Sequence, residues 1–179
     1  MVVAYDLGTY CRRVLDIRRE KGLDFAAQIE LIRDLVVRHR VTLGVVEQNS
    51  FQRWIVDELN RWPETNGRIF GNTTGRGRAD PRDGIPRLKL SLLAGSWVMP
   101  YGDAASVRLA RAWQTELGAF GSRNGRLEGV GEHDDMVVAS WYVELAVERV
   151  EELRIQDDYE IVTAADLGIE RVRISPDLD

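Results

Sequence analysis

The sequence has few of the features that mark disulfide-bonded, zinc-binding or membrane proteins. Its only cysteine is Cys11, which excludes an internal disulfide and a cysteine-rich zinc site and fits a reducing compartment. No apolar run approaches the roughly 18–20 residues that span a bilayer, and the N-terminus lacks the basic and then apolar layout of a signal peptide. We therefore expect an intracellular protein with no membrane partner.

Two common catalytic motifs and an excess of positive charge are also missing. There is no G-x-x-x-x-G-K-[ST] loop, which excludes nucleotide hydrolysis of the P-loop kind, and no G-x-S-x-G elbow. The net charge of −5 argues against a protein that coats nucleic acid by bulk electrostatics, although it leaves room for a local basic groove. Carboxylates that bind cations would account for part of this negative charge.

The bulk composition is that of a soluble globular protein. A chain of 179 residues with 44% hydrophobic and 30% charged residues is long enough to bury a real core. Neither an internal repeat nor a break in composition indicates a second domain. We expect one domain over residues 1–154, followed by a C-terminal tail over 155–179 with a possible strand at YEIV and an acidic end.

Helices and strands alternate in the predicted order of elements. The 4, 3, 4 spacing of Phe25, Ile29, Ile32 and Val36 predicts an amphipathic helix from the N-cap Asp24 to near Arg40. The other predicted strands are a hairpin of 2–6 and about 11–20, single strands at 41–47, 67–72 and 97–101, and a hairpin around Asn124-Gly125 within 118–133. The other predicted helices are at about 51–60, 85–94 and 104–117. A last helix begins at Asp134 and has on one face Met136, Ala139, Val143, Ala146 and Val150. This order predicts an α/β fold with a mixed sheet.

Glu47 ends VTLGVVE, a run without polar alternation that is typical of a strand buried on both faces. In open α/β sheets, ligands bind outside the carboxyl ends of the strands. A buried carboxylate at this position would need a cation or several hydrogen-bond donors. The alternative is that Glu47 has simply reached solvent where the strand ends.

Asp134 and Asp135 stand at the start of the last predicted helix, directly after His133. Aspartates are common there because they accept hydrogen bonds from free backbone N–H groups and suit the helix dipole. Two adjacent carboxylates repel each other, however, and capping needs only one, so a shared divalent cation explains the pair better. Oxygen ligands without cysteine select Mg²⁺ or Mn²⁺, and His133 could add a nitrogen ligand or orient an attacking water. Such a cluster suits phosphodiester hydrolysis.

Positive charge gathers in a glycine-, arginine- and proline-rich loop over 73–87, just after it, and at the predicted Asn-Gly hairpin. The residues are Arg76, Arg78, Arg82, Arg87, Lys89, Arg123 and Arg126. They are candidates for DNA contacts that bind phosphates without reading sequence. The alternative is a solvated loop whose arginines serve solubility. Trp54, Trp97, Trp113 and Trp141 are assigned to packing.

The order and spacing of several segments resemble the nuclease domain of the large terminase subunit of tailed bacteriophages. The segments are LDIRREKGLDFAAQIELIRDLV (15–36), GVVEQNSFQRWIVDEL (44–59), TGRGRADPRDGIPRL (74–88), WVMPYGD (97–103) and GEHDDMVVASWYVELA (131–146). The resemblance covers about residues 1–150. It implies a ribonuclease H-like fold, in which helices flank a mixed β-sheet on both faces.

The resemblance also implies an activity and a ligand set. Domains of this family cut concatemeric double-stranded DNA during genome packaging, with Mg²⁺ or Mn²⁺, here expected as two ions, held by acidic residues. By resemblance Glu47 is the second-strand glutamate, and Asp134 with Asp135 is the acidic pair that opens the last helix. The implied partners are double-stranded DNA, the terminase ATPase domain, the small terminase subunit and the portal. The implied location is the cytoplasm of an infected bacterial host or of a prophage carrier.

One departure from the family pattern concerns the first catalytic aspartate. In the family this aspartate lies on the first of three antiparallel strands that precede the first helix. This chain shows only two strands before its first helix. Asp6 is the candidate, but it lies only 41 residues before Glu47. We expect that VVAYD is the second strand and that the first strand lies upstream of Met1. The sheet would then have a gap beside the strand that ends in Glu47, and metal binding would be weak unless Asp6 substitutes.

Two other functions remain compatible with the sequence. One is a different ribonuclease H-like nuclease, such as a junction resolvase, which would prefer branched over linear duplexes. The other is a non-catalytic module that docks on DNA or the portal without cutting.

Overall fold

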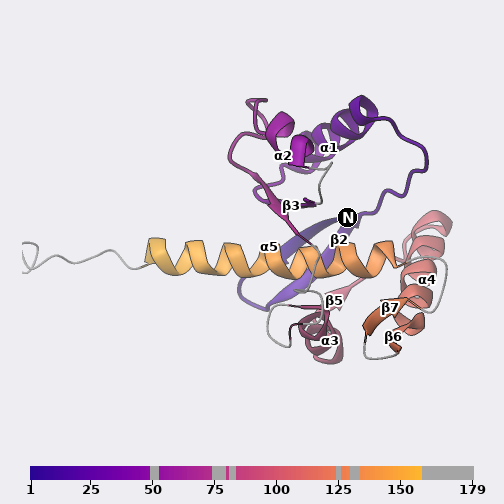
Figure 1. Ribbon diagram of the computed structural model, residues 1–179. Helices are drawn as coiled ribbons and strands as arrows, with labels where there is room; N and C mark the ends of the chain where they lie inside the picture. Colours follow the sequence, from indigo (N-terminus) through magenta and orange to yellow (C-terminus); the bar gives the residue numbers. More distant parts are fainter. Residues whose placement is uncertain (49–52, 74–79, 81–83, 124–125, 130–133, 159–179) are drawn as a thin grey trace, which may run out of the picture. The chain divides into compact units, whose positions relative to one another are not determined.

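A computed structural model describes residues 1–48, 53–73, 80, 84–123, 126–129 and 134–158 (Figure 1). The chain divides into two compact units, residues 1–147 and 148–179. The predicted division after residue 154 stays a prediction. The described residues form five helices and several short β-ladders, both parallel and antiparallel, so the protein is a mixed α/β structure.

The chain begins with the predicted hairpin of β1 (Val2–Asp6) and β2 (Cys11–Asp16), which pair antiparallel. The short β5 (Trp97–Val98) pairs parallel to β2 and completes a three-stranded sheet. Side chains alternate between the two faces of this sheet: Val14 is buried, whereas Arg13 and Leu15 beside it are exposed. Only one face of this sheet is therefore buried.

Four of the predicted strands are shorter than expected: β3 (Gly44–Glu47) and β4 (Ile69–Asn72) begin three and two residues later than predicted, and two others end early. β2 ends at Asp16 instead of near residue 20, and β5 ends at Val98, although a strand was predicted through Tyr101. Pro100 lacks a backbone N–H and cannot donate to a ladder, which explains the early end of β5.

The predicted helix after Asp24 is α1 (Phe25–His39). The Asp24 carboxylate accepts a hydrogen bond from the Ala27 N–H, and Arg40 ends the helix in the left-handed conformation with φ of 51°. The shorter α2 (Arg53–Leu59) follows β3 (Gly44–Glu47), and β4 (Ile69–Asn72) returns parallel to β3. A small core of Ile29, Val36, Ile55, Leu59 and Ile69 holds these elements together.

β3 packs against a different hydrophobic core on each of its faces. Val46 packs against the core of α1, α2 and β4, whereas Val45 packs against a second core that includes Val137 and Trp141. The sequence predicts a strand buried on both faces; the structure places an apolar core against each face, but every residue of the strand is only half-buried. It follows that β3 joins the N-terminal helices to the rest of the first unit.

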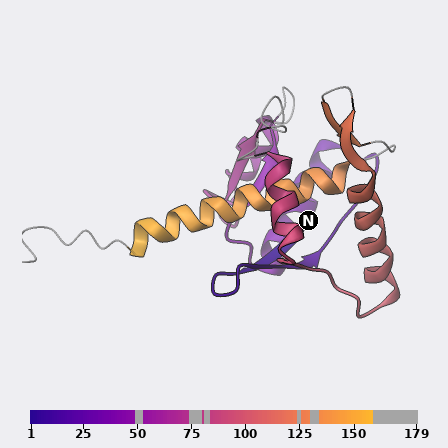
Figure 2. The ribbon, with the colours of Figure 1, turned by 90° about the horizontal axis from the view of Figure 1, so that it is seen from below.

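The remaining elements are α3 (Ile85–Leu93), α4 (Ala104–Ala119), the hairpin of β6 (Phe120–Arg123) and β7 (Arg126–Gly129), and α5 (Asp135–Asp158). Figure 2 shows the β6–β7 hairpin continuing from the end of α4. Asp103 caps α4 by accepting from the N–H groups of Ala105 and Ser106. A third core, formed by Val14, Ile17, Trp113 and Met136, joins β2, α4 and α5.

The buried face of α5 differs from the predicted one. Met136 is buried as expected, but Ala139, Val143, Ala146 and Val150 are only half-buried. The buried residues are Met136, Val137, Ser140, Trp141, Tyr142, Glu144 and Val147. The segment MVVASWYV is apolar almost all round, so its sequence has no single apolar stripe, and the two large aromatic rings decide which face turns inward.

The prediction that Trp54 is a packing residue is wrong. Trp113 and Trp141 are buried and Trp97 is half-buried, as expected for packing residues, but Trp54 is 73% exposed. It lies on the side of α2 away from Ile55 and Leu59, which the small core uses.

Among the described residues, the strands form three separate ladders: β1-β2-β5, β3-β4 and β6-β7. Within them, no strand joins β1 to β3. The second unit is described as far as Asp158, where it consists of the C-terminal half of α5 with an ion pair between Arg149 and Glu152. None of the described helices has the length and apolar character needed to cross a membrane.

Candidate functional site

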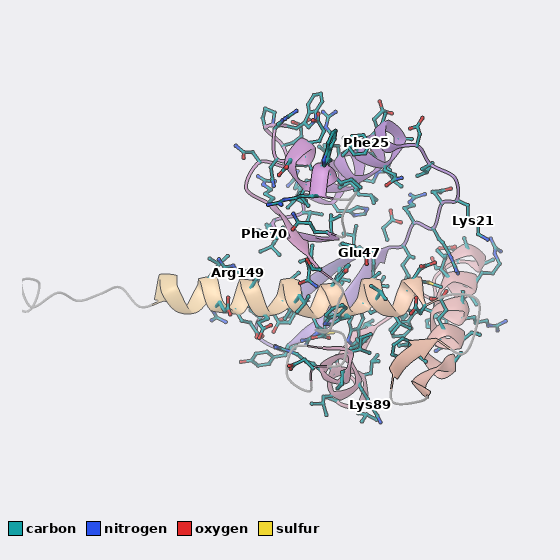
Figure 3. The ribbon with its side chains drawn as sticks, in the orientation of Figure 1. Lys21, Phe25, Glu47, Phe70, Lys89 and Arg149 are labelled. Carbon is teal, nitrogen blue, oxygen red and sulfur yellow. The ribbon has the colours of Figure 1, made fainter. Side chains whose placement is uncertain are left out.

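Glu47 is the last residue of β3, as the sequence predicts, and it is half-buried (Figure 3). Because side chains alternate along a strand, Glu47 lies on the same face as Val45. Val45 packs against the core that contains Val137 and Trp141 of α5. Glu47 therefore projects from the face of β3 that is turned toward α5, and not from the face that α1 and α2 cover.

Asp134 directly precedes α5 and is half-buried. Its backbone carbonyl accepts a helical hydrogen bond from the Val138 N–H at 3.0 Å. Residues three and seven positions along a helix share its face, so Asp134 lies on the stripe of Val137 and Trp141. The strand that carries Glu47 and the helix that follows Asp134 thus share one core.

Asp135 lies in a more open environment than Asp134. Its side chain is 71% exposed, and its Oδ2 lies 3.7 Å from Nη2 of Arg19. The same guanidinium places Nη1 2.9 Å from Oε1 of Glu116, a buried carboxylate on α4. Arg19 therefore stands between two carboxylates at the start of α5.

Glu116 also takes part in starting α5. Its Oε2 accepts a hydrogen bond from the Met136 N–H at 2.8 Å. This amide belongs to the first turn of α5, where N–H groups have no partner within the helix. The Met136 N–H therefore finds its acceptor on α4. If the aspartate pair served only to cap α5, this acceptor would be expected to be Asp134 or Asp135.

The described residues contain no group of three or more histidine, cysteine, aspartate or glutamate side chains arranged to hold a metal ion. The structure thus joins the strand that ends in Glu47 and the helix that follows Asp134 through one core, but it does not gather Glu47, Asp134 and Asp135 into such a group. His133 lies outside the described residues. A two-ion Mg²⁺ or Mn²⁺ site stays a prediction, and its donors would be hard carboxylate oxygens, which suit these ions.

Asp6 has a local structural role at the end of β1. Its Oδ1 accepts hydrogen bonds from the N–H groups of Gly8 at 2.8 Å and Thr9 at 3.1 Å. The hydrogen bonds from Thr9 and Gly8 hold the pKa of this exposed carboxyl below its ordinary value. Asp6 thus closes the turn between β1 and β2, and its proposed catalytic role stays a prediction.

The structure describes some of the predicted DNA-binding residues. Lys89 is exposed on α3 and projects away from α5, and Arg87 is half-buried on the same helix (Figure 3). Arg123 and Arg126 are directly paired across the β6–β7 hairpin. Arg76, Arg78 and Arg82 lie outside the described residues.

A buried polar network was not foreseen from the sequence. Glu144 on α5 is 1% exposed, and its two oxygens accept from Arg12 Nε at 3.1 Å and Nη2 at 2.7 Å. Ser91 and Trp97 also donate to Glu144, at 2.5 and 3.1 Å. The network joins β2, α3, β5 and α5. Because its carboxylate is enclosed and accepts four donors, we assign it to stability and not to catalysis.

One sequence signal could have revealed both overlooked glutamates. Glu116 and Glu144 each follow a buried tryptophan by three residues, Trp113 and Trp141 respectively. Residues three apart share a helix face, so each carboxylate is carried into the core beside its tryptophan. A charged residue at such a position needs a partner.

A comparison of the chain with protein-family models, with curated proteins and with solved structures finds no match.

Proposed function

We propose that this chain is a divalent-metal-dependent DNA endonuclease domain of the terminase large-subunit type, with a ribonuclease H-like arrangement of its strands. The observation that carries the proposal is the shared core of β3 and α5, with Glu47 and Asp134 on the faces that meet there. Carboxylates from a strand end and a helix start can converge on one cation, and Asp135 adds a third at the exposed edge.

The proposed chemistry is hydrolysis of a phosphodiester in double-stranded DNA. Bound Mg²⁺ or Mn²⁺ would activate water and stabilise the leaving oxygen. Glu47, Asp134 and Asp135 would hold the cations, with His133 as a further candidate ligand. Lys89 and the paired Arg123 and Arg126 would contact phosphates on either side of the cut. On this proposal the domain works with a terminase ATPase domain, a small subunit and a portal in the cytoplasm of an infected bacterium.

The first experiment is a plasmid-cleavage assay in Mn²⁺ and in Mg²⁺. We expect Glu47→Gln and Asp134→Asn each to reduce cutting by at least about 100-fold, because each removes a ligand charge. Asp34→Asn is the matched control, since it neutralises an exposed aspartate whose described partner is Arg38 on the same helix. Cutting that survives both ligand variants would overturn the proposal. Loss of robust cutting in Asp6→Ala would show that Asp6 supplies the first catalytic aspartate.

A non-catalytic docking module is the second candidate. It is favoured by the ion pair that already engages Asp135 and by the lack of a metal-holding group among the described side chains. DNA binding without cleavage in either cation would support this candidate. A preference for branched over linear duplex in the same assay would instead favour a junction resolvase.

A further inference from the structure

The contact between Arg19 and Asp135 bears directly on how this site would be loaded with metal. We propose that Arg19 occupies the cation position beside Asp135 and has to withdraw before Asp135 can bind a divalent ion. This inference rests on the proposed metal-dependent function and specifies its regulation.

Arg19 is suited to stand in for a cation because its guanidinium carries a permanent positive charge. Its two terminal nitrogens are directed at different carboxylates, Nη1 at Glu116 and Nη2 at Asp135. A divalent ion at the same carboxylates would be repelled by this charge. Arg19 and the ion therefore compete for Asp135.

The two halves of this contact differ in strength. Glu116 is 8% exposed and is fixed by its hydrogen bond to the Met136 N–H, so it anchors one end of the guanidinium. Asp135 is largely exposed and lies at the longer distance of 3.7 Å. Exposed ion pairs at such distances contribute little. The Asp135 half can therefore open while the Glu116 half persists.

The anchor itself is an ion pair without hydrogen-bond geometry. The buried Oε1 of Glu116 makes no hydrogen bond among the described residues, although Arg19 Nη1 lies 2.9 Å away. The Arg19 side chain is 30% exposed and extends from the segment that follows β2. The guanidinium can therefore turn on its flexible stem so that Nη2 leaves Asp135 for solvent while Nη1 stays beside Glu116. A DNA phosphate is a suitable new partner for it, since arginine binds phosphate well.

The test is a titration of the whole chain with Mn²⁺ in the absence of DNA. The electron paramagnetic resonance signal of free Mn²⁺ measures how much of the ion is bound. We expect Arg19→Gln to lower the Kd for Mn²⁺ about tenfold, because a positive charge within a few ångströms of the ion is removed. Arg19→Lys should stay close to wild type. Arg18→Gln is the matched control: it removes the same charge one residue away, where Arg18 pairs with Asp16, and should change Kd by less than about twofold.

The tighter Mn²⁺ binding of Arg19→Gln should depend on Asp135. Adding Asp135→Asn to Arg19→Gln should abolish the tighter binding, whereas a gain that persists would overturn the inference. Unchanged or weaker Mn²⁺ binding in Arg19→Gln would also overturn it. Arg19→Met, which keeps the aliphatic stem, provides the same measurement if Arg19→Gln does not fold.

The failure of this inference is distinguishable from the failure of the proposed function. If Asp134→Asn weakens Mn²⁺ binding but Arg19→Gln leaves it unchanged, the metal site stands and only the competition is wrong. If no variant at Glu47, Asp134, Asp135 or Arg19 changes Mn²⁺ binding, both are wrong.

Discussion

Two arginine–glutamate pairs join β2 and the segment after it to the helices, and they use their charges differently. Arg12 and Glu144 are almost fully buried and bind each other through two parallel hydrogen bonds. Arg19 and Glu116 meet through one contact, and Arg19 extends its second nitrogen to the exposed Asp135. The first pair is complete within the protein, whereas the second can exchange one partner.

The two pairs illustrate two roles of charged residues, one in stabilising the fold and one in controlling a candidate site. A buried ion pair joined by two hydrogen bonds holds secondary-structure elements together, and breaking it leaves a charge in the core. A half-exposed pair beside a candidate ligand costs little to open. We therefore expect the Arg12 pair to govern folding and the Arg19 pair to govern access to Asp135.

The largest expected effect comes from breaking the buried pair. Glu144→Ala should lower the free energy of unfolding by about 3–5 kcal/mol, because Arg12 would be left buried without its partner. Urea denaturation measures this change. Glu152→Ala, at an exposed position of the same helix, is the control and should stay within about 0.5 kcal/mol of wild type. Equal midpoints for the two variants would show that the buried pair does not stabilise the fold.

A smaller loss is expected from the second pair. Glu116→Ala removes the acceptor for the Met136 N–H and the partner of Arg19, so it should destabilise the protein by about 1–3 kcal/mol. Glu116→Gln keeps an acceptor for the amide and should lose less than Glu116→Ala. If urea denaturation gives the same loss for both variants, the amide hydrogen bond is not what Glu116 contributes.

Asp16 offers an intermediate case on the same stretch of chain. Burial raises the pKa of Asp16, but hydrogen bonds from His39 and Arg18 outweigh it and leave the pKa below its ordinary value. The ionised form therefore stabilises the fold above the pKa of the unfolded chain, and this contribution is lost as pH falls through the lower folded-state pKa. Asp16→Asn should cost about 1 kcal/mol at neutral pH. Urea midpoints measured from neutral to acidic pH should show this cost shrinking at the acidic end, and a constant cost would contradict the assignment.

The smallest effect on stability is expected at Asp135. Asp135→Asn weakens an ion pair that is long and exposed, and it should change the free energy of unfolding by less than about 0.5 kcal/mol. Thermal unfolding without metal tests this, with Asp34→Asn as a second exposed aspartate for comparison. A loss as large as that of Glu116→Ala would mean that Asp135 serves the fold and would remove the contrast between the two pairs.

The elements predicted best are those with strong local signals. α1 has an apolar stripe, an aspartate cap at Asp24 and a clear end, all of which act within a few residues of the chain. The β1–β2 hairpin was likewise predicted, and so was β3, although β3 begins at Gly44 instead of residue 41. β5 was predicted too long because a proline within an apolar run interrupts pairing with a strand that is distant in sequence.

The candidate site could be predicted only in part. Glu47 and Asp134 were found because a strand end and a helix start carry recognisable patterns. Arg19 and Glu116 were missed: an arginine in a loop has no distinctive local pattern, and the one signal for Glu116, its position three residues after Trp113, does not reveal its partner. The pair exists because the segment after β2 packs beside α4, where Ile17 and Trp113 share one core.

The sequence by itself determined the order of elements, the caps of α1 and α4 and the position of each candidate carboxylate at an element end, because these depend on interactions between near neighbours in the chain. Only the tertiary structure decided which face of α5 is buried and which carboxylates receive an arginine. Those outcomes depend on contacts between residues more than one hundred positions apart, such as Arg12 with Glu144 and Arg19 with Asp135, and no local pattern encodes such distances.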